Sequence, residues 1–171
     1  MYYISKYNSP LGGITVASDG EALFGLWFDG QKYFEDRLNK KESGEQSTDG
    51  FKVPVLKETE KWLDIYFSGK VPDFTPDLNL NGVSPFRKRV WEILLEIPYG
   101  KLTTYGQIAK KIEAETGKRV SAQAVGGAVG HNPISLIVPC HRVVGANGGL
   151  TGYAGGLDKK TFLLKLEGSI K

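Results

Sequence analysis

Three short apolar runs at the start of the chain predict an antiparallel β-sheet. Residues 2–5, 14–17 and 23–28 are rich in β-branched and aromatic side chains, which favour strands. Turn-forming residues at 9–13 and 19–21 separate these runs. Because consecutive strands joined by short turns usually pair with each other, we expect a meander here.

A helical pattern begins after a polar stretch. Residues 31–38 suit a short helix, whereas residues 40–49 offer almost nothing to bury, which indicates an exposed loop. Pro54 fits the first turn of a helix over 54–67, where an amide hydrogen is not needed. The predicted buried side of this helix consists of Val55, Leu56, Trp62, Leu63, Tyr66 and Phe67.

Start and stop signals predict further helices in the second half, after a turn-rich connection over 69–82. Ser84 followed by Pro85 opens one helix, and the capping box of Thr104 and Gln107 opens another. A last helix starts near Asp158. The expected buried positions are Phe86, Val90, Leu94 and Ile97 in the first helix, Ile108, Ala109 and Ile112 in the second, and Phe162, Leu163 and Leu166 in the last.

Residues 121–130 predict an unusual helix made almost entirely of small residues, with Ser121 as its cap. Each interior glycine costs a free helix about 1 kcal/mol relative to alanine. Small side chains allow close approach to another helix or to the floor of a DNA groove, and the residues alone leave both interpretations open. Two short helices joined by a turn favour a helix-turn-helix, with a turn or wing-like hairpin at 145–149.

The single cysteine, Cys140, stands beside one of two histidines at the end of an apolar, β-like run over 136–138. One cysteine can form neither an internal disulfide nor a multi-cysteine zinc site, so it is either a core residue or a reactive thiol. A reactive thiol needs a base to take its proton. Neighbouring strand residues point to opposite faces, so His141 reaches Cys140 only if Pro139 introduces a turn.

Charge divides the chain into unequal halves. Residues 1–79 carry 9 basic and 13 acidic side chains, a net charge of −4, whereas residues 80–171 carry 13 and 6, a net charge of +7. We therefore expect a scaffold domain over 1–79 and a domain over 80–171 that binds a polyanion, with nucleic acid as the leading candidate. No apolar run approaches the roughly 20 residues of a membrane helix, no signal peptide is visible, and a lone free thiol suits a cytoplasmic protein.

The segment around Cys140, Pro139–Val144, resembles the active-site signature of the O6-alkylguanine-DNA alkyltransferases, also called methylated-DNA protein-cysteine methyltransferases. The resemblance continues in the family's order and spacing over essentially all of residues 84–168. Its further elements are Tyr105–Ala109, Ala124–Ala128, Asn132-Pro133, Gly152–Leu157 and Leu166–Gly168.

The resemblance implies the chemistry of an irreversible, cofactor-free DNA repair protein. Cys140 would accept the alkyl group from a flipped O6-alkylguanine, His141 would act as a water-mediated base, and Glu167 would orient the histidine. Tyr105 would hydrogen-bond the flipped guanine and help its departure. Without the resemblance, a solvated or capping carboxylate at a helix end is the favoured interpretation of Glu167, and a buried structural residue is the favoured interpretation of Cys140.

The resemblance also implies how DNA is held. The helix capped by Ser121 would enter the minor groove, with Ala122 and Ala124 facing the groove floor. Gln123 departs from the pattern, because many relatives have an arginine that fills the space left by the flipped base. The base pocket or the architecture beneath the cysteine would involve four further residues: Asn132, Val143, Tyr153 and Ala154. Packing or turn-capping is the alternative interpretation of these residues, and for Asn132 this structural role is the favoured one.

The expected fold is therefore α/β (α+β): an N-terminal antiparallel-sheet domain with a flanking helix, and a C-terminal, mainly helical winged helix-turn-helix domain. The expected partner is double-stranded DNA containing O6-alkylguanine, bound by a monomer without cofactor, metal or membrane. Two other classes compete with this interpretation. Alkyltransferase-like DNA-binding proteins lack the acceptor cysteine that Cys140 supplies, and a Cys-His hydrolase would leave the basic half unexplained.

Overall fold

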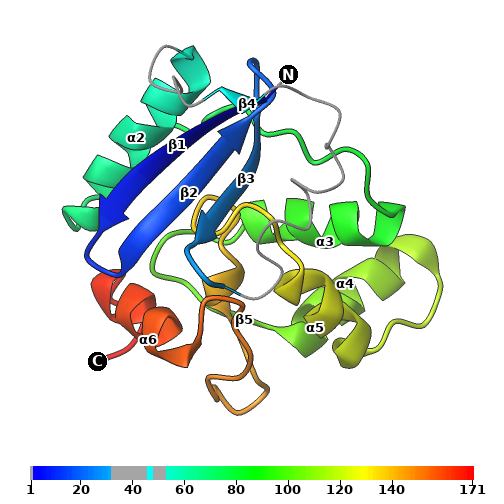
Figure 1. Cartoon of the computed structure of the whole chain (residues 1–171). Coiled ribbons are helices and arrows are strands. Elements are labelled where there is room, and N and C mark those ends of the chain that lie inside the picture. The colour runs from blue at the N-terminus through cyan, green and yellow to red at the C-terminus, as the bar shows by residue number, and fades with distance from the viewer. Residues whose placement is uncertain (1, 32–45, 48–52) are drawn as a thin grey trace. The chain divides into compact units, whose positions relative to one another are not determined.

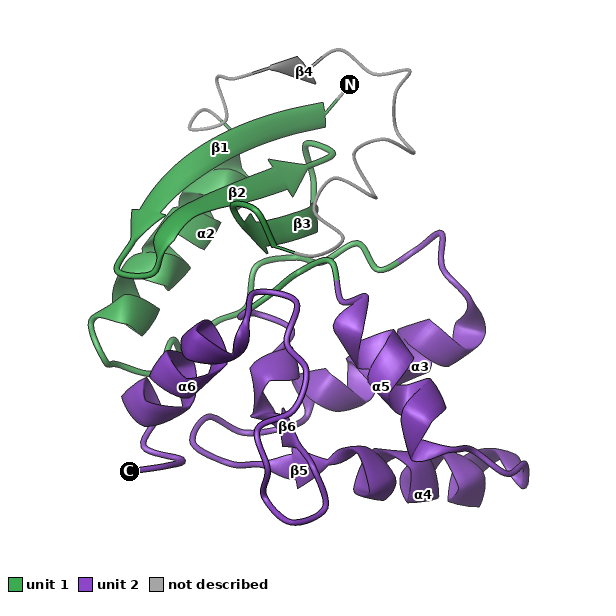
Figure 2. Ribbon diagram, turned by 60° about the horizontal axis from the view of Figure 1, so that its bottom comes forward, with its two compact units in different colours: residues 1–80, 133–135 green, residues 81–132, 136–171 purple. Residues whose placement is uncertain are grey.

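The computed structural model describes residues 2–31, 46–47 and 53–171 (Figure 1). Apart from Gln31, the helix predicted over 31–38 lies outside the described residues, and so does most of the loop predicted over 40–49. The chain divides into two compact units (Figure 2). Unit 1 consists of residues 1–80 with 133–135, and unit 2 consists of residues 81–132 with 136–171.

Unit 1 contains the predicted meander. Strands β1 (Tyr2–Ser9), β2 (Gly12–Ser18) and β3 (Leu23–Phe28) pair antiparallel in the order β3-β2-β1. A fourth strand, β4 (Gln46–Ser47), pairs parallel with β1. The prediction of a loop is therefore wrong at these two residues, because a polar dipeptide on a sheet edge needs only backbone pairing, not burial.

One helix, α2 (Pro54–Phe67), contacts β1 and β2 (Figure 1). Its bounds are those predicted, and Pro54 occupies the first turn as expected. Phe67 is not fully buried, whereas Thr59 is, because its hydroxyl donates to the Val55 carbonyl at 2.7 Å. The buried side is formed by Val55, Leu56, Thr59, Trp62, Leu63 and Tyr66.

Unit 2 is mainly helical, as predicted. Its caps are the expected ones: Ser84 accepts from the Arg87 amide, Thr104 forms a capping box with Gln107, and Ser121 accepts from the Ala124 amide. Among the residues the structure describes, no helix is both long and apolar enough to cross a membrane. The helices are α3 (Pro85–Leu95), α4 (Tyr105–Thr116), α5 (Ala122–Gly130) and α6 (Leu157–Leu166).

Two short strands of unit 2, β5 (Thr103–Thr104) and β6 (Val143–Val144), form a parallel pair. The segment over 145–149, predicted as a turn or hairpin, is a turn that follows β6 directly and has no strand on its other side. The Gly145 amide donates to the Gly149 carbonyl at 2.9 Å and closes this turn.

The apolar run over 136–138 is not the predicted strand. Its residues are buried in consecutive turns, and Leu136 adopts a left-handed φ of 71°. Burial of Phe162 was also wrongly predicted, because its side chain is 37% exposed. Helix α6 instead turns Lys160, Leu163 and Leu164 inward, at the i, i+3, i+4 spacing of one helix face.

Candidate active site

A tight backbone turn presents Cys140. Pro139 has φ −82° and ψ 65°, close to an inverse γ-turn, and the Cys140 amide closes the turn on the Val138 carbonyl at 2.8 Å. The Asn132 side-chain amide donates to the same carbonyl at 2.8 Å. A 3₁₀ turn, η2 (Cys140–Arg142), follows. The turn predicted at Pro139 is therefore confirmed, although no strand precedes it.

The Cys140 thiol is buried and poorly acidic in the resting protein. Burial raises its pKa, while a hydrogen bond with the Asn132 side chain and the positive charge of Lys160 act in the opposite direction. Asn132 thus touches both the turn and the sulfur, which joins the structural and functional interpretations of this residue. A thiol in this state needs a base before it can act as a nucleophile.

His141, the residue after the cysteine, forms a buried pair with Glu167, the C-cap of α6. His141 Nε2 lies 2.6 Å from Glu167 Oε2, and both side chains are fully buried. Because a carboxylate only accepts hydrogen bonds, Nε2 carries the proton and Nδ1 is left as the acceptor. Nδ1 has no hydrogen-bond partner among the described residues. Burial lowers the pKa of His141, so the ring is neutral near pH 7 and able to accept a proton.

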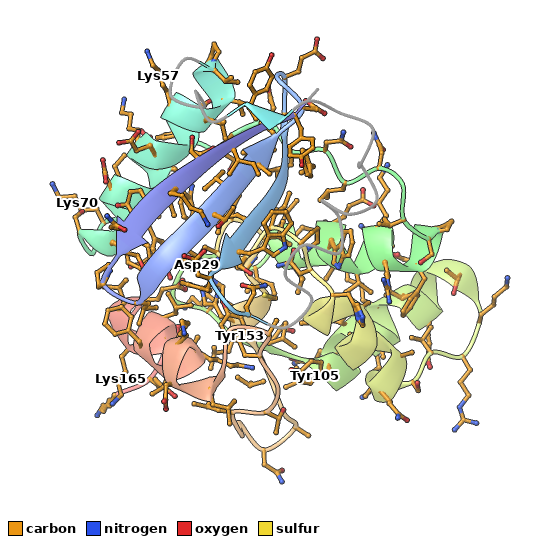
Figure 3. All side chains as sticks on the ribbon, in the orientation of Figure 1. Asp29, Lys57, Lys70, Tyr105, Tyr153 and Lys165 are labelled. Carbon is orange, nitrogen blue, oxygen red and sulfur yellow. The ribbon has the colours of Figure 1, made fainter. Side chains whose placement is uncertain are left out.

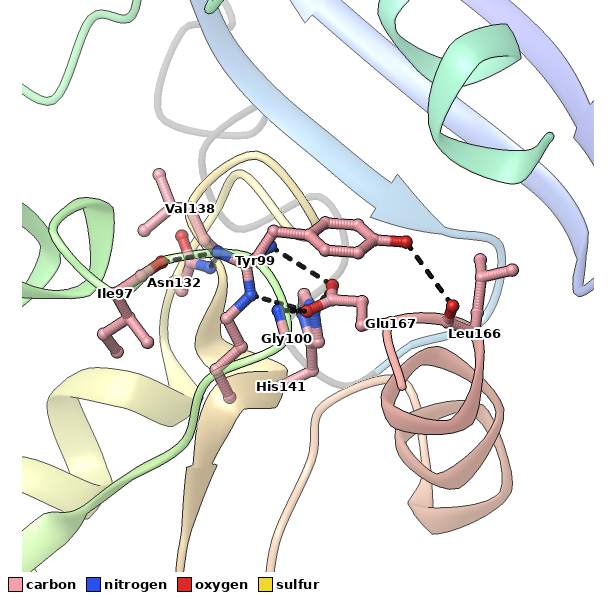
Figure 4. A network of polar contacts seen from close by, with 9 residues as sticks. Ile97, Tyr99, Gly100, Asn132, Val138, His141, Leu166 and Glu167 are labelled. Atoms are coloured by element: carbon pink, nitrogen blue, oxygen red, sulfur yellow. Dashed lines mark hydrogen bonds and ion pairs between the residues drawn. The ribbon is translucent and has the colours of Figure 1, made fainter. Parts of the chain in front are cut away.

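Arg142 holds the carboxylate of Glu167 from its other side. Its Nε donates to Glu167 Oε1 at 2.8 Å and its Nη2 to Oε2 at 3.2 Å, while Nη1 donates to the Ile97 carbonyl at 2.6 Å. The Gly100 amide, at 3.3 Å from Oε1, completes the network (Figure 4). Burial alone would raise the pKa of Glu167, but His141 and Arg142 outweigh it and hold that pKa well below its usual range. Glu167 therefore stays ionised inside the protein.

Lys160 is a second buried cation, on helix α6. Its Nζ donates to the carbonyls of Val143 at 2.6 Å, Thr151 at 3.0 Å and Gly152 at 3.4 Å. Burial lowers the pKa of Lys160 to about 8, and the nearby Cys140 raises it in part. One ammonium thereby ties the strand after the cysteine to the loop over 151–152.

Neither Arg142 nor Lys160 was singled out from the sequence. Arg142 stands inside the cysteine motif, where its type signals only a basic residue. Lys160 could have been found from its spacing, because it lies three and four residues before Leu163 and Leu164, which the structure buries.

Tyr105, at the start of α4, belongs to the same region. Its hydroxyl donates to the Thr151 carbonyl at 3.1 Å, the carbonyl that Lys160 also binds. Burial raises the pKa of Tyr105, so the phenol stays protonated and available as a donor. Among the remaining predicted pocket residues, Val143 is buried, whereas Tyr153 and Ala154 are partly exposed.

Helix α5 has one packed side and one open side. Val125, Ala128 and Val129 are buried, and the Ala128 carbonyl accepts from the Trp91 indole at 2.8 Å. Gly127 would meet nothing within 4 Å if it carried a Cβ. Small residues thus serve internal packing on one side, while the exposed first turn leaves room for a partner. That exposed turn consists of Ser121, Ala122, Gln123 and Ala124.

Unit 2 therefore brings together Cys140, His141 and Glu167 with the cations of Arg142 and Lys160, and it keeps the exposed turn of α5 on its surface. Within the described ranges, no group of three or more His, Cys, Asp or Glu side chains is placed to hold a metal ion. This arrangement suits nucleophilic chemistry at sulfur, with a neutral histidine as base and a carboxylate as its orienting partner.

Comparison with known proteins matches both halves of the chain. The family model described as "6-O-methylguanine DNA methyltransferase, DNA binding domain" matches residues 85–169. The family model described as "6-O-methylguanine DNA methyltransferase, ribonuclease-like domain" matches residues 1–81. A methylated-DNA–protein-cysteine methyltransferase of Methanosarcina acetivorans is 45% identical over 99% of this chain and 99% of its own length.

Solved structures of two proteins with related names are also similar to this chain. Mycobacterium tuberculosis OGT in complex with DNA is 40% identical, with a TM-score of 0.80, over 98% of this chain and 93% of that one. The O6-methylguanine-DNA methyltransferase of Pyrococcus kodakaraensis is 28% identical, with a TM-score of 0.64, over 98% of this chain and 99% of its own. With full-length identity of this order and two family models in sequence, the chain belongs to the 6-O-methylguanine DNA methyltransferase family.

Proposed function

We propose that this protein repairs DNA by moving the alkyl group of O6-alkylguanine onto the sulfur of Cys140. The observation that carries the proposal is the buried 2.6 Å hydrogen bond between His141 Nε2 and Glu167 Oε2, which leaves Nδ1 as a proton acceptor beside the lone cysteine. Relatives named as methylated-DNA–protein-cysteine methyltransferases, and a relative solved with DNA, support the same activity.

Proton transfer comes first. Because burial raises the pKa of the Cys140 thiol, the thiolate is scarce until a base accepts the proton. His141 Nδ1 takes that proton through one water molecule. Glu167 accepts the hydrogen bond from Nε2–H and stabilises the resulting imidazolium, while Arg142 keeps Glu167 ionised.

Transfer to sulfur then follows. The thiolate attacks the alkyl carbon, a carbon–sulfur bond forms, and the bond between that carbon and O6 of guanine breaks. The electron pair of that bond stays on guanine, which gains one proton, equivalent to the one that the thiol gave up, and remains in the DNA as the unmodified base. Tyr105 donates a hydrogen bond to this leaving guanine after releasing the Thr151 carbonyl, which Lys160 continues to bind. The product is a thioether, which is a poor leaving group, so each protein molecule acts once.

DNA binding places the lesion at this site. Helix α5 enters the minor groove by its exposed first turn, where Ala122 and Ala124 are small enough for close approach. Gln123 fills the space that the flipped guanine leaves, without the positive charge of an arginine. The domain over 80–171 carries this binding as a monomer, and Asn132, Val143, Tyr153 and Ala154 shape the pocket beside Cys140. The domain over 1–79 acts as a scaffold.

Incubation with duplex DNA containing isotopically labelled O6-methylguanine tests the proposal. After digestion, the label should lie on the peptide that contains Cys140, and Cys140→Ser should remain unlabelled while still binding the DNA. Label on another peptide, or undiminished transfer by Cys140→Ser, would contradict the proposed acceptor.

A further inference from the structure

A surface groove of unit 2 has no role in the proposed transfer reaction. Its volume is about 760 Å³, and it lies between the first turn of α3, the end of α4 and the first turn of α5. Phe86, Ile112 and Val120 give it an apolar floor, and Lys118 and Arg119 stand at its edge. We call it the cationic groove. A volume of this order is typical of sites for small ligands.

The two cations are held in place by the backbone beneath them. Helix α4 ends at Gly117, which adopts a left-handed φ of 69° and donates to the Glu113 carbonyl at 2.8 Å. The Lys118 amide donates to Thr116 Oγ1 at 3.2 Å, and the Val120 amide donates to Glu113 Oε1 at 2.7 Å. The connection between α4 and α5 is therefore an ordered edge of the groove.

Charge at the groove favours an anionic occupant. The side chains of Lys118 and Arg119 are exposed, and neither forms an ion pair with any residue that the structure describes. Arg89, the other cation of the lining, is already engaged by Glu115 through two hydrogen bonds of 2.8 and 2.5 Å. Among the residues that the structure describes, no acidic side chain lines the groove. The available charge is thus positive and confined to the edge.

The groove is continuous with the exposed turn of α5. Ser121 and Ala124 belong to both, and residues 85–169 match a DNA-binding domain. An apolar floor with one aromatic ring, edged by two cations, combines the two features by which proteins bind unpaired nucleotides: a base rests on the ring and its phosphate meets the cations. An acidic peptide would satisfy the charge, but it would not account for the continuity with α5.

We propose that the cationic groove binds an unpaired nucleotide of a DNA strand, with the base against Phe86 and the phosphate at Lys118 and Arg119. The choice of DNA as occupant rests on the proposed function, because α5 is the helix assigned there to DNA. The site is separate from the Cys140 network, which involves none of its lining residues. Through this site, the protein binds single-stranded DNA whether or not the strand contains an alkylated base.

Fluorescence anisotropy with a short fluorescein-labelled oligothymidylate tests the proposal, with an abasic strand of equal length as the second probe. The wild-type protein should bind the thymidine strand more tightly, and Phe86→Ala should remove most of this preference, a loss of about fivefold or more. The double variant Lys118→Gln with Arg119→Gln should weaken binding of both probes and make the plot of log affinity against log salt less steep by about 0.7, the value for one lost phosphate contact.

A matched double variant, Lys165→Gln with Lys171→Gln, removes the same charge from exposed positions of unit 2 outside the groove; Lys165 extends outward from α6 (Figure 3). It should leave the salt slope and the base preference unchanged. Equal effects of the two double variants, or a base preference that survives Phe86→Ala, would overturn the proposal. Dimerisation that is lost in Phe86→Ala would assign the groove to a second copy of the chain instead.

Transfer from free O6-benzylguanine to Cys140 separates this site from the transfer reaction and reports on folding. All groove variants should react at the wild-type rate. The wild-type protein could bind oligothymidylate as expected but transfer no alkyl group from O6-benzylguanine or from methylated duplex DNA. The proposed function would then be wrong, and the groove proposal would still hold. If transfer proceeds but the two strands bind alike, the groove proposal fails alone.

Discussion

The His141–Glu167 pair makes a specific prediction about pH. In the wild-type protein, the transfer rate should fall only as pH drops through the pKa of His141, which burial places below 6.5. Glu167→Gln weakens the base, so transfer should slow by about a hundredfold and the rate should keep rising above pH 9.0, because it then follows ionisation of a thiol whose pKa burial raises. Rates on methylated duplex DNA measured from acid to alkaline pH check this expectation.

Two further variants show whether the pair acts as a unit. His141→Ala combined with Glu167→Gln should cost much less than the sum of the single losses, because coupled catalytic residues are not additive. His131→Ala is the control, since this histidine lies at the end of α5, where its Nδ1 is 2.7 Å from the Gly127 carbonyl, and is not part of the Cys140 network. Simple additivity would reduce Glu167 to a structural carboxylate.

The lowered pKa of Lys160 predicts that the free energy of unfolding also depends on pH. Its pKa is lowered from 10.5 to about 8 in the folded protein, so between these values the unfolded chain binds more protons than the folded one. Stability therefore rises with pH across this window, by up to about 3 kcal/mol from this group. Relative to Lys160→Met, the free energy of unfolding of the wild-type protein should increase from pH 8 to 10.5 in urea titrations. A constant difference would show that Lys160 keeps its proton.

Enlarging a side chain in the exposed first turn of α5 tests whether this helix approaches DNA closely. Ala122 lies in its exposed first turn and does not line the cationic groove, so Ala122→Leu should block close approach to DNA without disturbing the interior. Repair of duplex DNA should fall at least tenfold, a change of about 1.4 kcal/mol or more, while transfer from free O6-benzylguanine should stay the same. Ala114→Leu, the same change at an exposed site of α4, should affect neither substrate. Equal losses on both substrates would place Ala122 in the folded interior.

The proposed role of Gln123 predicts that the effect of its substitution on repair depends on whether the substrate is duplex DNA, single-stranded DNA or the free base. Flipping a base costs a few kcal/mol of stacking and pairing, and a side chain that fills the vacated space recovers part of this cost. Gln123→Ala should therefore slow repair in duplex DNA, slow it less in single strands, and leave transfer from the free base unchanged. Gln123→Arg should preserve or raise duplex activity and steepen its salt dependence. Wild-type duplex rates in Gln123→Ala would mean that another residue fills the gap.

The elements differ in how far the sequence predicts them. Helix α2 and the caps of α3, α4 and α5 follow from proline, serine and threonine at helix starts, together with apolar spacing. The run over 136–138 was wrongly predicted as a strand because it is buried throughout, and continuous burial carries no periodicity. The partners of Lys160 are backbone carbonyls, which no side-chain pattern reveals.

Hydrogen bonds between residues far apart in the sequence explain why the two units do not follow the predicted division at residue 80 throughout. Residues 133–135 belong to unit 1 because the Leu26 amide donates to the Pro133 carbonyl at 2.8 Å and the Ser135 amide donates to the Leu26 carbonyl at 2.9 Å. No local signal in the sequence indicates such a contact. The candidate site is more predictable, because Cys140, His141 and Glu167 all lie within the motifs that carry the family resemblance, which implies roles that their residue types alone leave open.

The number of alkyl groups that one protein molecule can accept tests the central claim most directly. A fixed amount of homogeneous protein is mixed with increasing amounts of O6-methylguanine duplex, and the intact protein is weighed by mass spectrometry. The mass should rise by one CH₂ per molecule and then stop, with one O6-methylguanine restored to guanine in the DNA for each protein molecule and no further repair at any excess of DNA. Repair of more than one lesion per molecule, with the protein mass unchanged, would contradict transfer to Cys140.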